Sequence, residues 1–202
     1  MNIARFSKFV LLPLLAVLLG ACASRRPVPT GFLSDYSKLQ PDGPARAVHF
    51  SPKLAAYSSF IVDPVRLGAG EGKLTLAQRE EVTSYMHDSI VKVYTSRGYR
   101  VVSHSGRDTA RVRMAITDLK KSTWWLNLYW ATKLSGLGTG GAAMEGEIID
   151  SRSGDQLAAV IDAGRGNQFE LDTFSALDDV KDVIDRWVKK AGERMDRLRR
   201  SQ

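Results

Sequence analysis

Residues 108–119, DTARVRMAITDL, alternate between apolar and polar side chains along most of their length. The apolar positions are Ala110, Val112, Met114 and Ile116, and the polar positions include Arg111, Arg113 and Thr117. A period of two residues is typical of a β-strand that buries one of its two faces. This stretch therefore predicts a long strand that forms one wall of the core.

Further strands are predicted at residues 59–67, 99–103, 143–150 and 156–162, which are runs rich in apolar and β-branched side chains. Pro64 cannot donate a hydrogen bond to a neighbouring strand, so it places the first of these at a strand end, a bulge or an edge. Residues 151–155 (SRSGD) predict the tight turn of a hairpin, because Gly154 tolerates a positive φ.

Two long helices complete the set of elements. The first begins at a capping box formed by Thr75 and Gln78 and ends before Gly98, which can adopt left-handed geometry. The second runs from about residue 175 to residue 200, where apolar side chains recur every three or four positions without interruption. Acidic residues in its first turn and arginines in its last turn complement the helix dipole.

The order of these elements predicts an α+β fold of two layers. We expect a mostly antiparallel sheet of about five strands, covered on one face by the two long amphipathic helices, because each helix needs one apolar wall. A doubly wound parallel sheet is disfavoured, since no crossover helices separate the four middle strands. Ahead of them, residues 31–40 predict a segment that packs across the domain surface through Phe32, Leu33, Tyr36 and Leu39.

The first 22 residues, MNIARFSKFVLLPLLAVLLGAC, have the parts of an export signal. Arg5 and Lys8 form a cationic start, and the apolar stretch 9–19 is about half as long as the ~20 residues that a membrane-spanning helix needs. Its end resembles the lipobox of bacterial lipoproteins, in which cleavage between Ala21 and Cys22 leaves a cysteine that carries diacylglycerol and an N-acyl lipid. The alternative is an ordinary signal peptide with an incidental cysteine.

This interpretation divides the chain into a signal peptide at residues 1–21, a lipidated Cys22 with its tether at residues 22–30, and one periplasmic α+β domain at residues 31–202. Cys22 is the only cysteine, so lipidation leaves no thiol for a disulfide or a metal. Ala23 stands where well-studied Gram-negative lipoproteins carry an aspartate as a retention signal, so we expect sorting to the outer membrane. Without residues 1–21, 27 Lys and Arg stand against 22 Asp and Glu, an excess too small for a nucleic-acid footprint.

Four stretches carry a resemblance to a known family. They are residues 31–36 (GFLSDY), 60–65 (FIVDPV), 111–118 (RVRMAITD) and 145–154 (EGEIIDSRSG). Together they look like the bacterial lipoproteins of the domain-of-unknown-function 3313 family, over about residues 31–194. The resemblance implies a lipid-anchored domain that faces the periplasm, and it brings no catalytic residues with it. The tryptophan-rich stretch after Lys121 has no place in the family pattern.

The candidate interaction site is that stretch, residues 124–130 (WWLNLYW), which holds three of the four tryptophans. Trp124, Trp125, Tyr129 and Trp130 belong to the residue types that gather at membrane interfaces and in protein–protein hot spots. Three interpretations stay open. The stretch fills one end of the core, contacts a protein partner, or contacts the membrane.

Other motifs that suggest chemistry have simpler explanations. The glycine run at residues 136–141 lacks the helix and the lysine of a phosphate-binding loop, and the three histidines are too scattered to hold a metal. Ser103 and His104, as neighbours on a strand, are expected to point to opposite faces. Glu145 and Glu147 share one strand face near the spacing that glycosidases use, but such pairs are common on exposed strand faces.

The sequence thus predicts a protein that is not an enzyme and that has no metal and no cofactor apart from the covalent lipid. We expect a structural or protein-interaction module of the cell envelope, anchored in the outer membrane and facing the periplasm. An envelope protein is the expected partner, and nucleic acid is not. The alternative function is a module that binds a lipid or a cell-wall ligand through residues 124–130.

Overall fold

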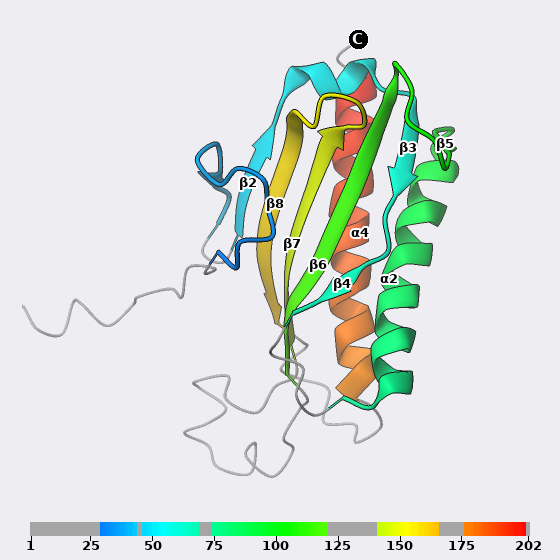
Figure 1. The fold of residues 1–202 in the computed structure, drawn as a ribbon. Helices are drawn as coiled ribbons and strands as arrows, with labels where there is room; N and C mark the ends of the chain where they lie inside the picture. The colour runs from blue at the N-terminus through cyan, green and yellow to red at the C-terminus, as the bar shows by residue number, and fades with distance from the viewer. Residues whose placement is uncertain (1–28, 44–45, 69–73, 121–140, 166–175, 201–202) are drawn as a thin grey trace, which may run out of the picture.

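A computed structural model describes residues 29–43, 46–68, 74–120, 141–165 and 176–200 of the chain. Its elements are β1 (Gln40–Pro41), β2 (Arg46–Phe50), the 3-10 helix η2 (Pro52–Ala56), β3 (Ser59–Val62), β4 (Arg66–Leu67), α2 (Leu76–Thr95), β5 (Arg100–Val101), β6 (Thr109–Lys120), β7 (Gly141–Asp150), β8 (Gln156–Arg165) and α4 (Ala176–Arg200). Figure 1 shows α2 and α4 side by side on one face of a single sheet. Among the described residues, neither helix has an apolar stretch that could span a membrane.

Helix α2 begins and ends as the sequence predicts. The Thr75 hydroxyl oxygen accepts a hydrogen bond from the backbone N–H of Gln78 (3.2 Å), and the Gln78 side chain accepts one from the backbone N–H of Thr75 (3.1 Å). These two bonds satisfy donors that the first turn of a helix leaves without partners. Beyond the last turn, Gly98 has a φ of +79°. The predicted capping box and the predicted stop are both confirmed.

The sheet differs from the one expected. It has eight strands in the order β1-β2-β8-β7-β6-β3-β5, with β4 paired to β6. The pairs among β1, β2, β8, β7 and β6 are antiparallel, whereas β3 runs parallel to both β5 and β6 and β4 runs parallel to β6. The prediction of about five mostly antiparallel strands is wrong, because the sheet is mixed and larger, although the α+β class holds.

The physical reason for the parallel pairs is the place of α2 in the chain. A helix that follows one strand and precedes another returns the chain to the end where the first strand began, so the two strands can pair in parallel. Helix α2 makes this crossover between β3 and the later strands β5 and β6. Pro64 also divides the predicted strand 59–67 into β3 and β4, which adds to the strand count.

The main core lies between the helices and the sheet. Strands β6 and β7 turn Val112, Ile116 and Met144 towards the helices, and α4 contributes Ile184 and Trp187. The apolar side chains predicted to alternate along residues 108–119 therefore point into this core, and the polar side chains between them point to the opposite face of the sheet.

The turn between β7 and β8 is held by one carboxylate. Asp150 accepts hydrogen bonds from the hydroxyl of Tyr57 (2.6 Å) and from the backbone N–H groups of Arg152 (2.8 Å) and Ser153 (2.7 Å). These bonds, with the Tyr57 hydroxyl first, lower the pKa of Asp150 to about 2. Gly154 completes the turn with a φ of +79°, as the sequence predicts.

We expect the contribution of Asp150 to stability to depend on pH. Its folded-state pKa lies below the ordinary value of 3.8, so the carboxylate stabilises the fold above about pH 4, and this stabilisation is lost as the pH falls towards 2. Asp150→Asn should lower the free energy of unfolding near neutral pH, and the difference from the parent should shrink between about pH 4 and pH 2. Urea unfolding at a series of pH values measures this, with Asp155→Asn in the same turn as the control. A difference that stays constant to the lowest pH would contradict the assignment.

Trp187 should be one of the most costly residues to truncate. It is 6% exposed and packs against the sheet from α4, so Trp187→Ala should cost about 3–5 kcal/mol of unfolding free energy. Leu76→Ala is the control, because Leu76 is 84% exposed and its truncation should change stability by less than about 0.5 kcal/mol. Equal denaturation midpoints for the two variants would show that α4 is not docked through Trp187.

Candidate functional site

The residues predicted from the sequence to carry function lie outside the described residues. They are Ala21 and Cys22 at the lipidation site and Trp124, Trp125, Tyr129 and Trp130 in the tryptophan-rich stretch. Their roles stay predictions. The described residues offer two other features, one on each face of the sheet, and both involve β7.

The first feature is an acidic pair, Glu145 and Glu147, that is buried. The two side chains are 0% and 2% exposed, and they leave β7 on the face opposite the helices. The expectation of a pair on an exposed strand face is wrong. Burying an isolated carboxylate costs free energy, so each of the two must be paired or hydrogen-bonded. The partners of the acidic pair therefore define a specific site in the fold.

The chain that covers the acidic pair is residues 29–39, called the N-terminal segment below. Leu33 is buried against Ala159 and Ile161 of β8, and the neighbouring Phe32, Tyr36 and Leu39 are partly buried in the same cluster. The prediction that this stretch packs across the domain through these four side chains is confirmed. At β7 and β8 the sheet is therefore covered on both faces, by helices on one and by the N-terminal segment on the other.

Glu145 binds the beginning of the N-terminal segment. Its Oε1 accepts a hydrogen bond from the backbone N–H of Thr30 (2.7 Å), and its Oε2 accepts one from the Tyr36 hydroxyl. The Tyr36 hydroxyl oxygen in turn accepts the backbone N–H groups of Gly31 (2.8 Å) and Leu33 (3.1 Å). Burial, and then the hydrogen bond to Glu145, raise the pKa of the Tyr36 phenol. The phenol thus stays protonated and acts as both donor and acceptor.

Glu147 binds the middle of the same segment. Its Oε2 accepts the backbone N–H (2.9 Å) and the hydroxyl (2.7 Å) of Ser34 and the side-chain amide of Gln156 (2.9 Å). Its Oε1 lies 2.6 Å from Nη1 of Arg113, which stands directly opposite Glu147 on β6. The Arg113 guanidinium also lies 5.3 Å from the centre of the Phe32 ring. One arginine therefore neutralises the carboxylate and contacts the segment above it.

This arrangement limits what the acidic pair can do. All four carboxylate oxygens accept at least one hydrogen bond from the protein. A general acid or base needs an oxygen within reach of a substrate, and here the N-terminal segment occupies that position. The acidic pair is suited to fixing the segment, and its geometry gives no support to a glycosidase.

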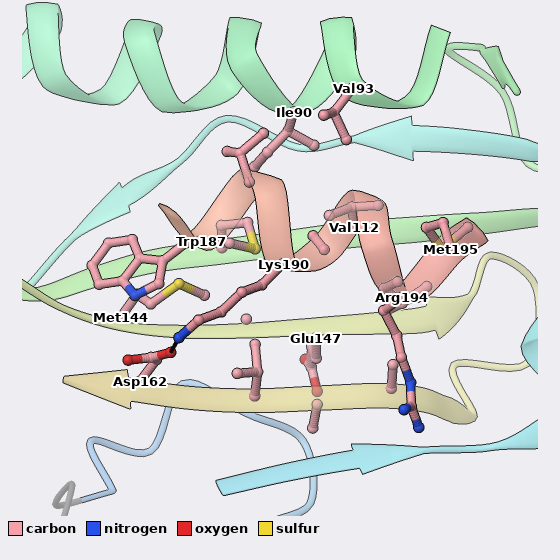
Figure 2. A pocket seen from close by; sticks show the side chains of 18 of the residues that line it. Ile90, Val93, Val112, Met144, Glu147, Asp162, Trp187, Lys190, Arg194 and Met195 are labelled. Carbon is pink, nitrogen blue, oxygen red and sulfur yellow. Dashed lines mark hydrogen bonds and ion pairs between the residues drawn. The ribbon is translucent and has the colours of Figure 1, made fainter. Parts of the chain in front are cut away.

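The second feature is a small apolar cavity on the helix face of the sheet, shown in Figure 2. It measures about 90 Å³ and lies between the helices α2 and α4 and strands β6, β7, β8 and β2. Its walls are almost entirely apolar, and they include Met144 and Trp187. Charged side chains stand at its mouth. Arg46 Nε and Lys190 Nζ lie 3.4 Å and 3.1 Å from Oδ2 of Asp162.

Two other possibilities for chemistry can be judged from the structure. Ser103 Oγ lies 2.8 Å from His104 Nδ1, because both residues follow β5 on a bend, so the expectation that a strand would separate them is wrong. Both are exposed, and in the described part of the chain no carboxylate bonds to His104, as a catalytic triad would need. The same part of the chain contains no group of three or more His, Cys, Asp or Glu that could hold a metal ion.

The chain matches one family model, described as a protein of unknown function (DUF3313), over residues 29–191. That range contains both the N-terminal segment and the acidic pair. No curated protein matches the chain.

Several solved structures are similar in outline. A PelC dodecamer from Paraburkholderia phytofirmans has 10% identity, covers 70% of this chain and 92% of its own, and gives a TM-score of 0.45. A DUF330 protein from Xanthomonas campestris has 11% identity, coverage of 73% and 91%, and a TM-score of 0.42. A minor lipoprotein from Acinetobacter baumannii has 13% identity, coverage of 69% and 90%, and a TM-score of 0.35.

Truncating the acidic pair should release the N-terminal segment. Glu147→Ala leaves Arg113 and the Ser34 donors without their acceptor, and we expect a loss of about 3 kcal/mol of unfolding free energy. The amide of Ser34 should then exchange hydrogen much faster while the amides of β6 stay protected. Glu193→Ala, at an exposed position of α4, is the control. Slow exchange at Ser34 in the Glu147 variant would contradict the proposed fixing role.

Proposed function

The chain belongs to the protein family of unknown function DUF3313, and we propose that it is a lipid-anchored, non-enzymatic module of the bacterial cell envelope. Cys22 carries the lipid, Ala23 directs the protein to the outer membrane, and the domain faces the periplasm. There the module supports or docks onto an envelope protein. It acts by binding and positioning that protein.

The N-terminal segment is the observation that carries this proposal. Thr30, whose backbone N–H bonds to the buried Glu145 (2.7 Å), follows Cys22 by only eight residues. Eight residues of extended chain span at most about 28 Å. An anchor at Cys22 would therefore keep the sheet close to the membrane. A long flexible linker, in contrast, would leave the sheet free to move away.

The way in which the segment is attached supports the same function. Its bonds go to carboxylates with almost no exposed surface, and its apolar side chains pack on β8. Such an attachment passes a displacement of the anchor directly to the central strands. A domain that positions a partner near a membrane needs this kind of connection, whereas an enzyme that acts on a free substrate does not.

The anchor is tested by two substitutions. Cys22→Ala should abolish the incorporation of a labelled fatty acid and should leave the precursor uncleaved or move the domain into the soluble fraction, because the attached acyl chains are what make membrane attachment effectively permanent. Ala23→Asp should keep the label and move the protein from the outer to the inner membrane fraction. Ala23→Ser is the matched control and should leave the outer-membrane position unchanged.

The results separate the parts of the proposal. A parent protein that takes up no fatty acid would refute the lipid anchor. A parent that takes up the label but sediments with the inner membrane would refute only the outer-membrane location. Crosslinking in intact cells then tests the partner, since the proposal requires a specific envelope protein that is crosslinked by the parent and lost with Cys22→Ala.

A further inference from the structure

One end of the domain gathers basic side chains from four segments. These segments are residues 51–58, 97–108, 150–155 and 195–200, which lie together at the end of the domain where α4 ends (Figure 1). Three contacts join them: the backbone N–H of Ser58 to the carbonyl of Asp108 (3.2 Å), Ser105 Oγ to the carbonyl of Ser151 (3.1 Å), and the Arg199 guanidinium to the centre of the Tyr99 ring (4.7 Å). The four segments, called the basic end below, therefore form one surface.

The basic end holds nearly all the excess positive charge of the chain. It contains eight Lys and Arg residues and four Asp residues, an excess of four. The chain without residues 1–21 has 27 Lys and Arg against 22 Asp and Glu, an excess of five. The rest of that chain therefore has an excess of only one, and the positive charge is concentrated at one end of the domain.

Most of these cations are not neutralised by a neighbouring carboxylate. Arg97 lies 3.1 Å from Asp196, and Arg100 lies 3.2 Å from Asp108. The other six are exposed and form no ion pair within the described part of the chain: Lys53, Arg107, Arg152, Arg197, Arg199 and Arg200. Compensation of the helix dipole explains the arginines in the last turn of α4, but it does not explain the cations on the two loops. These cations are therefore available to a partner.

The opposite end of the helix layer is acidic. Helices α2 and α4 run in the same direction and both begin there (Figure 1). Near these beginnings, Lys181 of α4 pairs with Glu81 of α2 at 2.6 Å. The exposed side chains of the first two turns include Glu80, Glu81, Asp178 and Asp182. A negatively charged surface would therefore attract the basic end and repel the beginning of the two helices.

The tether lets the basic end reach the membrane. Thr30 is bound to Glu145 of β7, and β7 continues for five more residues to Asp150 at the basic end, a distance of about 17 Å. The eight residues between Cys22 and Thr30 span up to about 28 Å. A lipid on Cys22 can therefore lie level with the basic end. The tether permits this orientation, and the distribution of charge selects it.

We propose that the basic end contacts the phosphate groups of anionic phospholipids in the membrane that holds the lipid of Cys22. The proposal rests on the lipid anchor of the proposed function and adds an orientation, in which the ends of both helices face the membrane. Arginine binds phosphate through two parallel hydrogen bonds, and clustered Lys and Arg close to a membrane attract anionic lipids. An acidic protein is the competing partner. The membrane is favoured because the tether already brings it within reach.

The test uses the lipidated protein in vesicles of phosphatidylcholine, either alone or mixed with phosphatidylglycerol. Because Cys22 is the only cysteine and its sulfur carries the lipid, an introduced cysteine is the only free thiol. Ala56→Cys places a fluorophore in the basic end, and Ala77→Cys places one at the start of α2, both at exposed positions. In anionic vesicles, lipids with a spin-labelled headgroup should quench the fluorophore at Ala56→Cys at least about twofold more strongly than that at Ala77→Cys. Pure phosphatidylcholine should abolish this difference.

Paired substitutions examine the charges. Arg107→Gln with Arg152→Gln removes two exposed cations of the basic end and should reduce the quenching difference by at least about half. Arg66→Gln with Lys189→Gln is the matched control, since both residues are exposed and lie outside the basic end, and it should leave the difference unchanged. High salt should reduce the difference in the parent, because it screens exposed charges. Circular dichroism confirms that each variant is folded.

Three quenching results would overturn the proposal. They are equal quenching of the two fluorophores in anionic vesicles, the same difference in pure phosphatidylcholine, and a loss with the control pair as large as that with Arg107→Gln and Arg152→Gln. The basic end would instead belong to an acidic protein if the latter pair abolished crosslinking to an envelope protein and left the quenching difference unchanged.

Flotation of the vesicles separates this orientation from the anchor. A chain that floats with neither kind of vesicle has no anchor, and both proposals then fail. A chain that floats with both kinds and shows equal quenching keeps the anchor and refutes only the contact of the basic end.

Discussion

Two buried carboxylates determine how the N-terminal segment and the sheet fit together in this structure. Glu145 and Glu147 lie on β7 in the middle of the sheet, where an unpartnered charge would cost several kcal/mol. The strands alone do not satisfy them. The N-terminal segment does, through the backbone N–H groups of Thr30 and Ser34 and the hydroxyl of Tyr36. A segment that could have remained a loose leader is therefore part of the folded domain.

The same strand contributes to both features because its side chains alternate. Odd-numbered positions of β7 carry the acidic pair to the N-terminal segment, while Gly146 and Ile148 face the cavity beneath α4. A protein interior is close-packed and transmits strain. A shift of β7 on one face of the sheet would therefore reach the other face. The short motif Glu-Gly-Glu thus combines two charges for one face with an opening for the other.

Local signals in the sequence predict the elements of this fold well, and long-range pairing is where they fail. The capping box at Thr75, the turn at Gly154 and the packing of residues 31–40 depend on neighbouring residues or on apolar spacing, and the structure confirms them. Parallel pairing of β3 with β6 depends on the end of the sheet to which α2 brings the chain back. No local sequence pattern predicts that end. The burial of Glu145 depends on Thr30, which is 115 residues away in sequence. Cys22 and the tryptophan-rich stretch lie outside the described residues, so their predicted roles stay predictions.

The edges of the sheet restrict how a partner can bind. An exposed edge strand offers free N–H and C=O groups to which another chain can add. Here the order of strands ends in β1 and β5, each only two residues long, and β1 contains Pro41, which has no N–H to donate. A partner strand would find few hydrogen bonds at either edge, while the long strands β6, β7 and β8 are kept in the interior of the sheet. A contact made by side chains on a surface therefore fits this fold better than the addition of a strand.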